Sequence, residues 1–153
     1  MLANPMNYDS ANAAFAPTVV KGCLVVSLPA DLAGRIEALR EVVLEGVRAQ
    51  RARSVILDFS GLQLLDATEF GQLRATLKMV SLLGASAVLC GLRPGVVAYL
   101  VMNDVDTQGL AFVRDLDEAL SAALDASAEH ETAAGTTDDE TGEARDSDRE
   151  AAP

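Results

Sequence analysis

Histidine, cysteine and tryptophan are scarce in this sequence, and their scarcity excludes several kinds of chemistry. The 153 residues include one histidine, two cysteines and no tryptophan. His130 lies in an acidic carboxyl-terminal stretch, and Cys23 and Cys90 lie in separate apolar runs. A Ser-His-Asp or Cys-His catalytic arrangement, or a zinc site with such ligands, would need groups that the body of the chain does not contain. We therefore expect no metal and no cofactor, and two cysteines that are small core residues.

Positive charge is also scarce. The formal net charge is −11, of which residues 126–153 carry −7 and the remainder −4. An acidic chain lacks the field that attracts nucleic acid or an anionic membrane, so neither is expected as a partner. The sequence has no disulfide framework, no basic export signal and no apolar stretch of about 18 residues. These absences predict a cytoplasmic protein.

The length and the composition predict one folded domain between two disordered ends. Residues 1–14 are small and polar without a sustained period, and residues 126–153 contain no large aliphatic side chain. We expect disorder in both, and a solubilising role for the acidic tail. The domain itself is predicted to span residues 15–125.

Alternating strand and helix patterns within residues 15–125 predict an α/β fold. Two short apolar runs around Lys21-Gly22 indicate an opening β-hairpin. A helix capped by Asp31 should follow, and then SVILDF, a helix ending at Gly84, SAVLCGL, a helix from Pro94, LAFV and the helix LDEALSAAL. Two apolar helical stripes support this order: Leu32, Ile36, Leu39, Val43 and Val47 in the first helix, and Phe70, Leu73, Leu77, Val80 and Leu83 in the second.

The order β-β-α-β-α-β-α-β-α implies a mainly parallel sheet joined by right-handed crossovers. The pattern leaves open whether the helices cover one face of this sheet or both. Ligands and partners of such sheets usually meet the loops after the carboxyl ends of the strands. The turn that follows SVILDF is therefore the first place to look for a functional site.

That turn contains a helix-capping signature. Asp66 followed three positions later by Glu69, just before an apolar helical stripe, is the pattern of a capping box. Ala67 and Thr68 would then be the first two helical residues, at the positive end of the helix dipole. A hydroxyl there is well placed for phosphorylation, because a phosphate at a helix amino terminus meets free N–H groups. Capping by itself explains both acids without a functional role.

The stretch SVILDFSGLQLLDATEFGQL, the helix ending SLLGA and the strand and loop AVLCGLRPGVVAYLV resemble the STAS domain family of anti-sigma factor antagonists. The opening GCLVVSL and the spacing from LLDAT through LLGA to GLRP are most similar to the RsbS-type stressosome scaffold proteins. The resemblance covers roughly residues 15–125. It implies a non-enzymatic regulator that changes partners when a switch kinase phosphorylates a serine or threonine at this helix start. The implied partners are a serine/threonine kinase and paralogous STAS co-antagonists, in a homo- or hetero-oligomer.

The sequence departs from that family pattern at the expected phosphoacceptor. Asp66 matches the family aspartate, but the next residue is Ala67, which has no hydroxyl. Thr68 follows one position later, about 100° around the helix. Tyr99 stands where the co-antagonists carry a second regulatory hydroxyl. Either Thr68 has taken over the switch, or the protein is a scaffold held in its unmodified binding state. We favour the scaffold, because a phosphate on Thr68 would lie between two carboxylates.

Two other hypotheses stay open at this point. In the leading hypothesis, the partner-binding region is Asp66, Ala67, Thr68 and Glu69. A simpler anti-sigma factor antagonist would instead bind an anti-sigma factor kinase outside any stressosome. An enzyme on the same fold is disfavoured, because Asp58 lacks the acidic pair and the lysine of a receiver site, and GLRPG lacks the lysine of a phosphate loop. Asp58 is expected to be a polar residue at the end of a strand.

Overall fold

The computed structural model describes residues 14–136, with side chains to residue 129. The predictions of disorder for residues 1–13 and 137–153 lie outside the described residues. The elements are β1 Thr18–Val20, β2 Cys23–Ser27, α2 Ile36–Gln50, β3 Ser54–Asp58, α3 Ala67–Leu82, β4 Ser86–Cys90, α4 Pro94–Met102, β5 Ala111–Val113 and α5 Leu116–Thr136. This order confirms the predicted α/β fold.

β1 and β2 form the predicted hairpin. Lys21 and Gly22 connect them, with φ of 51° and 78°. Two consecutive left-handed residues match the right-handed twist of an antiparallel pair, and glycine adopts this conformation without a steric cost. The strands pair from Thr18 opposite Val25 to Val20 opposite Cys23.

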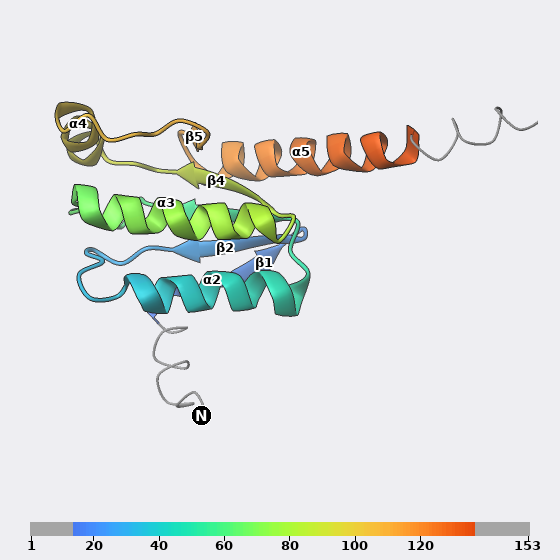
Figure 1. The fold of residues 1–153 in the computed structure, drawn as a ribbon, viewed down its shortest axis with the longest axis horizontal. Helices are drawn as coiled ribbons and strands as arrows, with labels where there is room; N and C mark the ends of the chain where they lie inside the picture. The colour runs from blue at the N-terminus through green and yellow to red at the C-terminus, as the bar shows by residue number, and fades with distance from the viewer. Residues whose placement is uncertain (1–13, 137–153) are drawn as a thin grey trace, which may run out of the picture.

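The sheet has five strands in the order β1-β2-β3-β4-β5, and β2 to β5 are parallel. The three parallel connections all run in the same direction along the sheet, and right-handed crossovers then place their helices on one face. α2 and α3 cover that face in Figure 1, and α4 lies within the connection between β4 and β5, beyond the carboxyl end of β4. α5 follows the last strand and packs on the opposite face against β3 and β4. Helices therefore cover both faces, which the sequence pattern left open.

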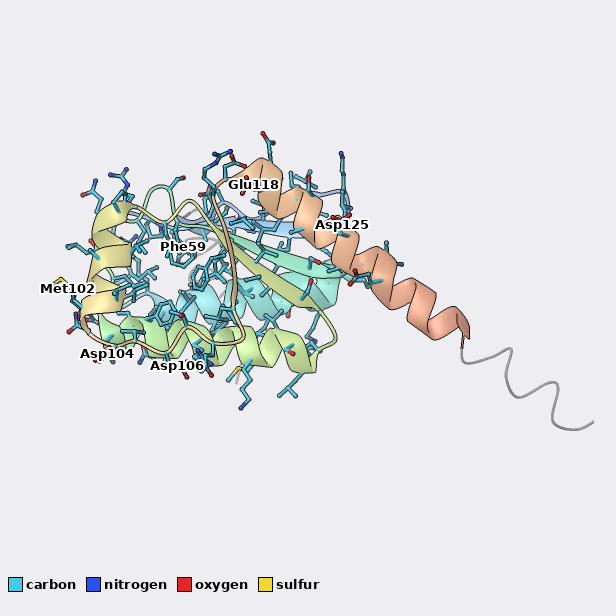
Figure 2. All side chains as sticks on the ribbon, turned by 90° about the horizontal axis from the view of Figure 1, so that it is seen from above. Phe59, Met102, Asp104, Asp106, Glu118 and Asp125 are labelled. Atoms are coloured by element: carbon cyan, nitrogen blue, oxygen red, sulfur yellow. The ribbon has the colours of Figure 1, made fainter. Side chains whose placement is uncertain are left out.

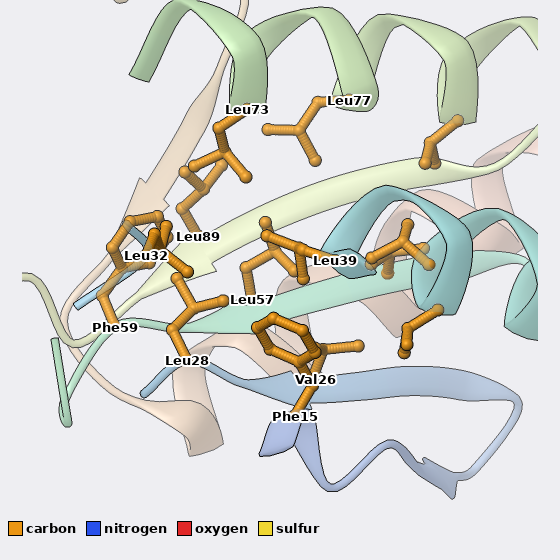
Figure 3. Packing of buried hydrophobic residues seen from close by; sticks show 14 of the residues in the cluster. Phe15, Val26, Leu28, Leu32, Leu39, Leu57, Phe59, Leu73, Leu77 and Leu89 are labelled. Atoms are coloured by element: carbon orange, nitrogen blue, oxygen red, sulfur yellow. The ribbon is translucent and has the colours of Figure 1, made fainter. Parts of the chain in front are cut away.

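Alternate residues of the central strands supply two separate apolar clusters. Val55 and Leu57 of β3 face α2 and α3, and Ile56 between them faces α5. The larger cluster is shown in Figure 3, where Phe15, Leu39 and Leu73 pack over the strands. The smaller cluster combines residues of β2, β3 and β4 with two alanines of α5: Cys23, Val25, Ile56, Val88, Cys90, Ala119 and Ala123. Both cysteines are buried core residues, as predicted.

The first long helix begins later than predicted, and Asp31 does not cap it. α2 begins at Ile36 after Arg35, which makes no side-chain capping bond. Asp31 instead accepts a hydrogen bond from the N–H of Ala33 at 3.2 Å, within a turn that contains Gly34 at φ 69°. A left-handed glycine interrupts the helical backbone, so the helix begins only after it.

Two further details differ from the sequence pattern. Leu83 was expected to complete a buried stripe, but it is 49% exposed because α3 ends at Leu82 and Leu83 is its carboxyl cap. α5 continues past residue 125 to Thr136, so residues 126–136 are helical rather than disordered. Alanine and glutamate are frequent in that stretch and favour a helix even where few side chains are buried.

Candidate functional site

The amino terminus of α3 is closed by the predicted capping box. Oδ1 of Asp66 accepts from the N–H of Glu69 at 2.7 Å, and Oε2 of Glu69 accepts from the N–H of Asp66 at 3.1 Å. Asp66 has extended backbone angles, as an N-cap residue requires. Both carboxylates also lie at the positive end of the helix dipole, where negative charge is stabilising.

Removal of this cap gives a measurable effect. Asp66→Ala leaves the N–H of Glu69 without its side-chain acceptor, and we expect the free energy of unfolding to fall by about 1 kcal/mol in urea titrations. Asp66→Asn is the matched control, since asparagine caps as well as aspartate and loses only the charge. An equal loss in both variants would contradict the hydrogen bond as the source of the effect.

The loop between β3 and α3 is held by both its backbone and its side chains. Phe59, Leu62 and Leu65 are buried, whereas Leu64 is 71% exposed. The N–H groups of Gln63 and Leu64 both donate to the carbonyl oxygen of Ala30, at 2.8 and 3.4 Å. Because Leu62 and Leu65 on either side of Leu64 are buried, the loop is held in place with the Leu64 side chain exposed to solvent.

α4 contributes Tyr99 to the same region. The N–H of Ala67 donates to the Tyr99 hydroxyl oxygen at 3.4 Å, which joins the start of α3 to α4 across 32 sequence positions. A depression of about 550 Å³ lies between these elements and the loop before α2. Its lining residues are Asp31, Ala33, Gln63, Leu64, Leu65, Asp66, Glu69, Gly95, Val96 and Tyr99.

The structure brings part of the predicted site together. Asp66 and Glu69 line the depression, and the N–H of Ala67 between them donates to the Tyr99 hydroxyl oxygen. Thr68 is exposed and does not line the depression. Asp31 and Leu64 also lie here, and sequence analysis had assigned neither to the site. A leucine within the run LQLL carries no signal of exposure, because only tertiary packing decides which leucine faces outward.

Asp58 and Cys90 lie side by side on neighbouring strands beneath this region. They are register partners of β3 and β4, and Asp58 Oδ1 accepts from the N–H of Ser60 at 2.9 Å. Burial raises the pKa of the Cys90 thiol to about 11, with smaller contributions from the Asp58 and Asp115 carboxylates. Such a thiol is protonated at neutral pH and is not a nucleophile. Asp58 holds the turn after β3, as expected for a polar residue at a strand end.

Two classes of site are missing from residues 14–136. No group of three or more histidine, cysteine or acidic side chains within the described part of the chain could hold a metal ion. None of the helices described there has the length and apolar character needed to cross a membrane.

Comparisons with known proteins agree with this architecture. The sequence model of the STAS domain matches residues 14–120. No curated protein matches the chain in sequence. Among solved structures, an RsbS protein of Moorella thermoacetica superposes with a TM-score of 0.63 at 22% identity, over 72% of this chain and 95% of that one.

Two further structures are similar. A chain from a structure of the stressosome, described as a signal integration and transduction hub, has a TM-score of 0.63 at 22% identity, over 72% of this chain and 97% of that one. The unphosphorylated anti-sigma factor antagonist SpoIIAA has a TM-score of 0.53 at 16% identity, over 70% and 93% of the two chains. At these identities the likeness shows a shared fold.

Proposed function

The chain belongs to the STAS domain family, and on that premise we propose that it regulates other proteins by binding and releasing them, without catalysis of its own. The contact surface in this proposal is the start of α3, formed by Asp66, Ala67, Thr68 and Glu69, together with the exposed Leu64. We call these five residues the switch surface. The observation that carries the proposal is the capped start of α3 beside an open depression.

The chemistry of the switch surface supports a protein partner. Leu64 is an exposed apolar side chain, and Asp66 and Glu69 line the same depression. Interfaces commonly combine an apolar centre with a polar rim. The partner should therefore carry an apolar pocket with basic side chains around it.

The finer proposal is an RsbS-like scaffold. In this form the chain binds a switch serine/threonine kinase and paralogous STAS co-antagonists in a stressosome-type complex, as the architecture of its structural neighbours suggests. Ala67 lacks a hydroxyl, so the scaffold would remain in its binding state. A simple anti-sigma factor antagonist, with an anti-sigma factor as its only partner, is the alternative that the SpoIIAA likeness favours.

Affinity capture of the tagged full chain from its own cells distinguishes the scaffold from the simple antagonist. Mass spectrometry identifies the co-purifying chains and the modification of the tryptic peptide that ends at Arg74. A kinase with STAS paralogues supports the scaffold, and an anti-sigma factor alone supports the simple antagonist. Phosphate on Thr68, with release of the partner abolished by Thr68→Ala, would overturn the permanent scaffold.

A matched pair of variants tests the switch surface itself. Leu64→Asp should abolish capture of that partner, because a charge replaces the apolar centre of the contact. Leu82→Asp is the control, since Leu82 is 81% exposed at the other end of α3. Normal capture by the Leu64 variant, or equal loss in both variants, would contradict the proposed surface.

A further inference from the structure

α4 is apolar on every side although most of it faces solvent. Its nine residues, PGVVAYLVM, include no charged side chain, and only Val96 and Leu100 are buried. Val101 is 70% exposed and Met102 is 83% exposed. A helix that is hydrophobic all round is normally covered all round, and a contiguous exposed apolar patch marks an interaction site.

One flank of α4 forms a groove with β5. The groove has a volume of about 540 Å³, with Val97, Leu100 and Val101 on one wall and Phe112 and Val113 on the other. Val97 and Phe112 are 43% and 39% exposed. β5 is the edge strand of the sheet, so no further strand of the described chain covers this wall. The groove is open and mainly apolar, it follows α4 from Val97 to Val101, and Thr107, Arg114 and Glu118 also line it.

Acidic side chains lie at both ends of this groove. Asp104 and Asp106 follow the outer end of α4, where Figure 2 shows Asp104 near Met102 and Asp106 farther along the loop. At the other end Glu118 lines the groove beside Arg114, and Asp115 and Asp117 are its sequence neighbours at the start of α5. The cations nearby are Arg74, which pairs with Asp106 at 3.5 Å, Arg114, which pairs with Asp115 and Glu118 at 3.6 and 3.5 Å, and Arg93, whose Nε donates to the Ser60 carbonyl oxygen at 2.9 Å. The acids outnumber these cations, so both ends carry negative charge.

We propose that the groove between α4 and β5 binds an amphipathic helix of a partner protein whose apolar stripe is flanked by lysine or arginine. Nine residues of α4 span about 13 Å, so about two and a half turns of a partner helix can lie along it, with side chains at helical spacing facing the groove. Basic flanks complement the acids at both ends. A second copy of this chain would fit the groove less well than such a helix. In a two-fold symmetric dimer, each acidic end of the groove would face an acidic end of the other copy.

A defined peptide is the probe for this groove. A 15-residue helix with leucine on one face and lysine on its flanks is titrated into the ¹⁵N-labelled full chain at physiological ionic strength. We expect amide shift changes to cluster in α4, in residues 103–110 and in β5. Val101→Ser should weaken binding by about tenfold, the factor that burial of one such side chain contributes.

Three controls decide the outcome. The Leu82→Ser variant, changed at another strongly exposed apolar position, and the Asp66→Ala variant, changed on the switch surface, should bind the peptide within about twofold of the unchanged chain. The Asp66 variant separates this inference from the proposed function, because the switch surface can fail to bind its partner while the groove still binds the peptide. A counterpart peptide with glutamate in place of lysine should not bind.

Four results would overturn the inference. Non-specific attraction of the peptide to acidic side chains would give amide shift changes along the outer face of α5. It would also give equal affinities for the Val101 and Leu82 variants. Tighter binding of an extended peptide that alternates valine and lysine would indicate strand addition to β5. A dimer in sedimentation velocity that Val101→Ser dissociates would show that a second copy covers the groove.

Discussion

Phe59→Ala should lower the free energy of unfolding by about 3–5 kcal/mol, a large part of the roughly 5–15 kcal/mol typical of a domain. Phe59 is fully buried beneath the loop that carries the switch surface, and it points into the interior in Figure 2. Its N–H donates to the Cys90 carbonyl at 2.8 Å, and its own carbonyl accepts from Leu62 at 2.9 Å. The truncation leaves a cavity where the loop leaves β3. Urea titration measures the loss as a lower midpoint with an unchanged slope.

Leu82→Ala is the control for this measurement. Leu82 is 81% exposed, so we expect a change within about 0.5 kcal/mol. Capture of the partner by the Phe59 variant should also fall, in proportion to the fraction of the variant that is unfolded. A loss of stability below about 1 kcal/mol would mean that neighbouring side chains refill the space, contrary to the packing in Figure 3.

Ala119→Asp should detach α5 from the sheet and lower the free energy of unfolding by about 3 kcal/mol. Ala119 is fully buried against the cluster that contains Cys23 and Cys90. A carboxylate there would lose its hydration among apolar atoms without a cation to compensate. In the unchanged protein both thiols are buried, and burial raises the pKa of both, so they should react slowly with Ellman's reagent at pH 8. In the variant they should react rapidly.

Ser121→Asp is the matched control on the solvent side of the same helix. Ser121 is exposed, so the added charge keeps its hydration, and we expect native stability and slow thiol reaction. Rapid thiol reaction in both variants would indicate that α5 dissociates readily by itself. Slow reaction in both would show that the helix accommodates a carboxylate at position 119, contrary to its burial.

The sequence by itself determined the local features of this protein. Strands in SVILDF and SAVLCGL and a helix after Pro94 follow from hydrophobic period and turn chemistry, which act between near neighbours. The capping box follows for the same reason, because Asp66 and Glu69 are three residues apart and bond within one helical turn. The parallel sheet follows from the alternation of strands and helices.

Local rules failed at two places. Asp31 had the sequence context of a helix cap, but its turn pairs with the loop at Leu64, and Gly34 delays α2. Residues 126–136 had the composition of a disordered tail, yet they continue a helix that Ala119 and Ala123 dock on the sheet. Leu64 lies 33 positions from Asp31, whereas Gly34, Ala119 and Ala123 lie close in sequence to the segments that they affect.

Only the tertiary structure decided how the candidate surfaces are assembled. The placement of α5 on the opposite face depends on two alanines small enough for close approach to β3 and β4. The hydrogen bond between Ala67 and Tyr99 joins residues 32 positions apart. The exposure of Leu64 between buried Leu62 and Leu65, and that of α4 beside β5, depends on what packs against each element, which no local pattern specifies.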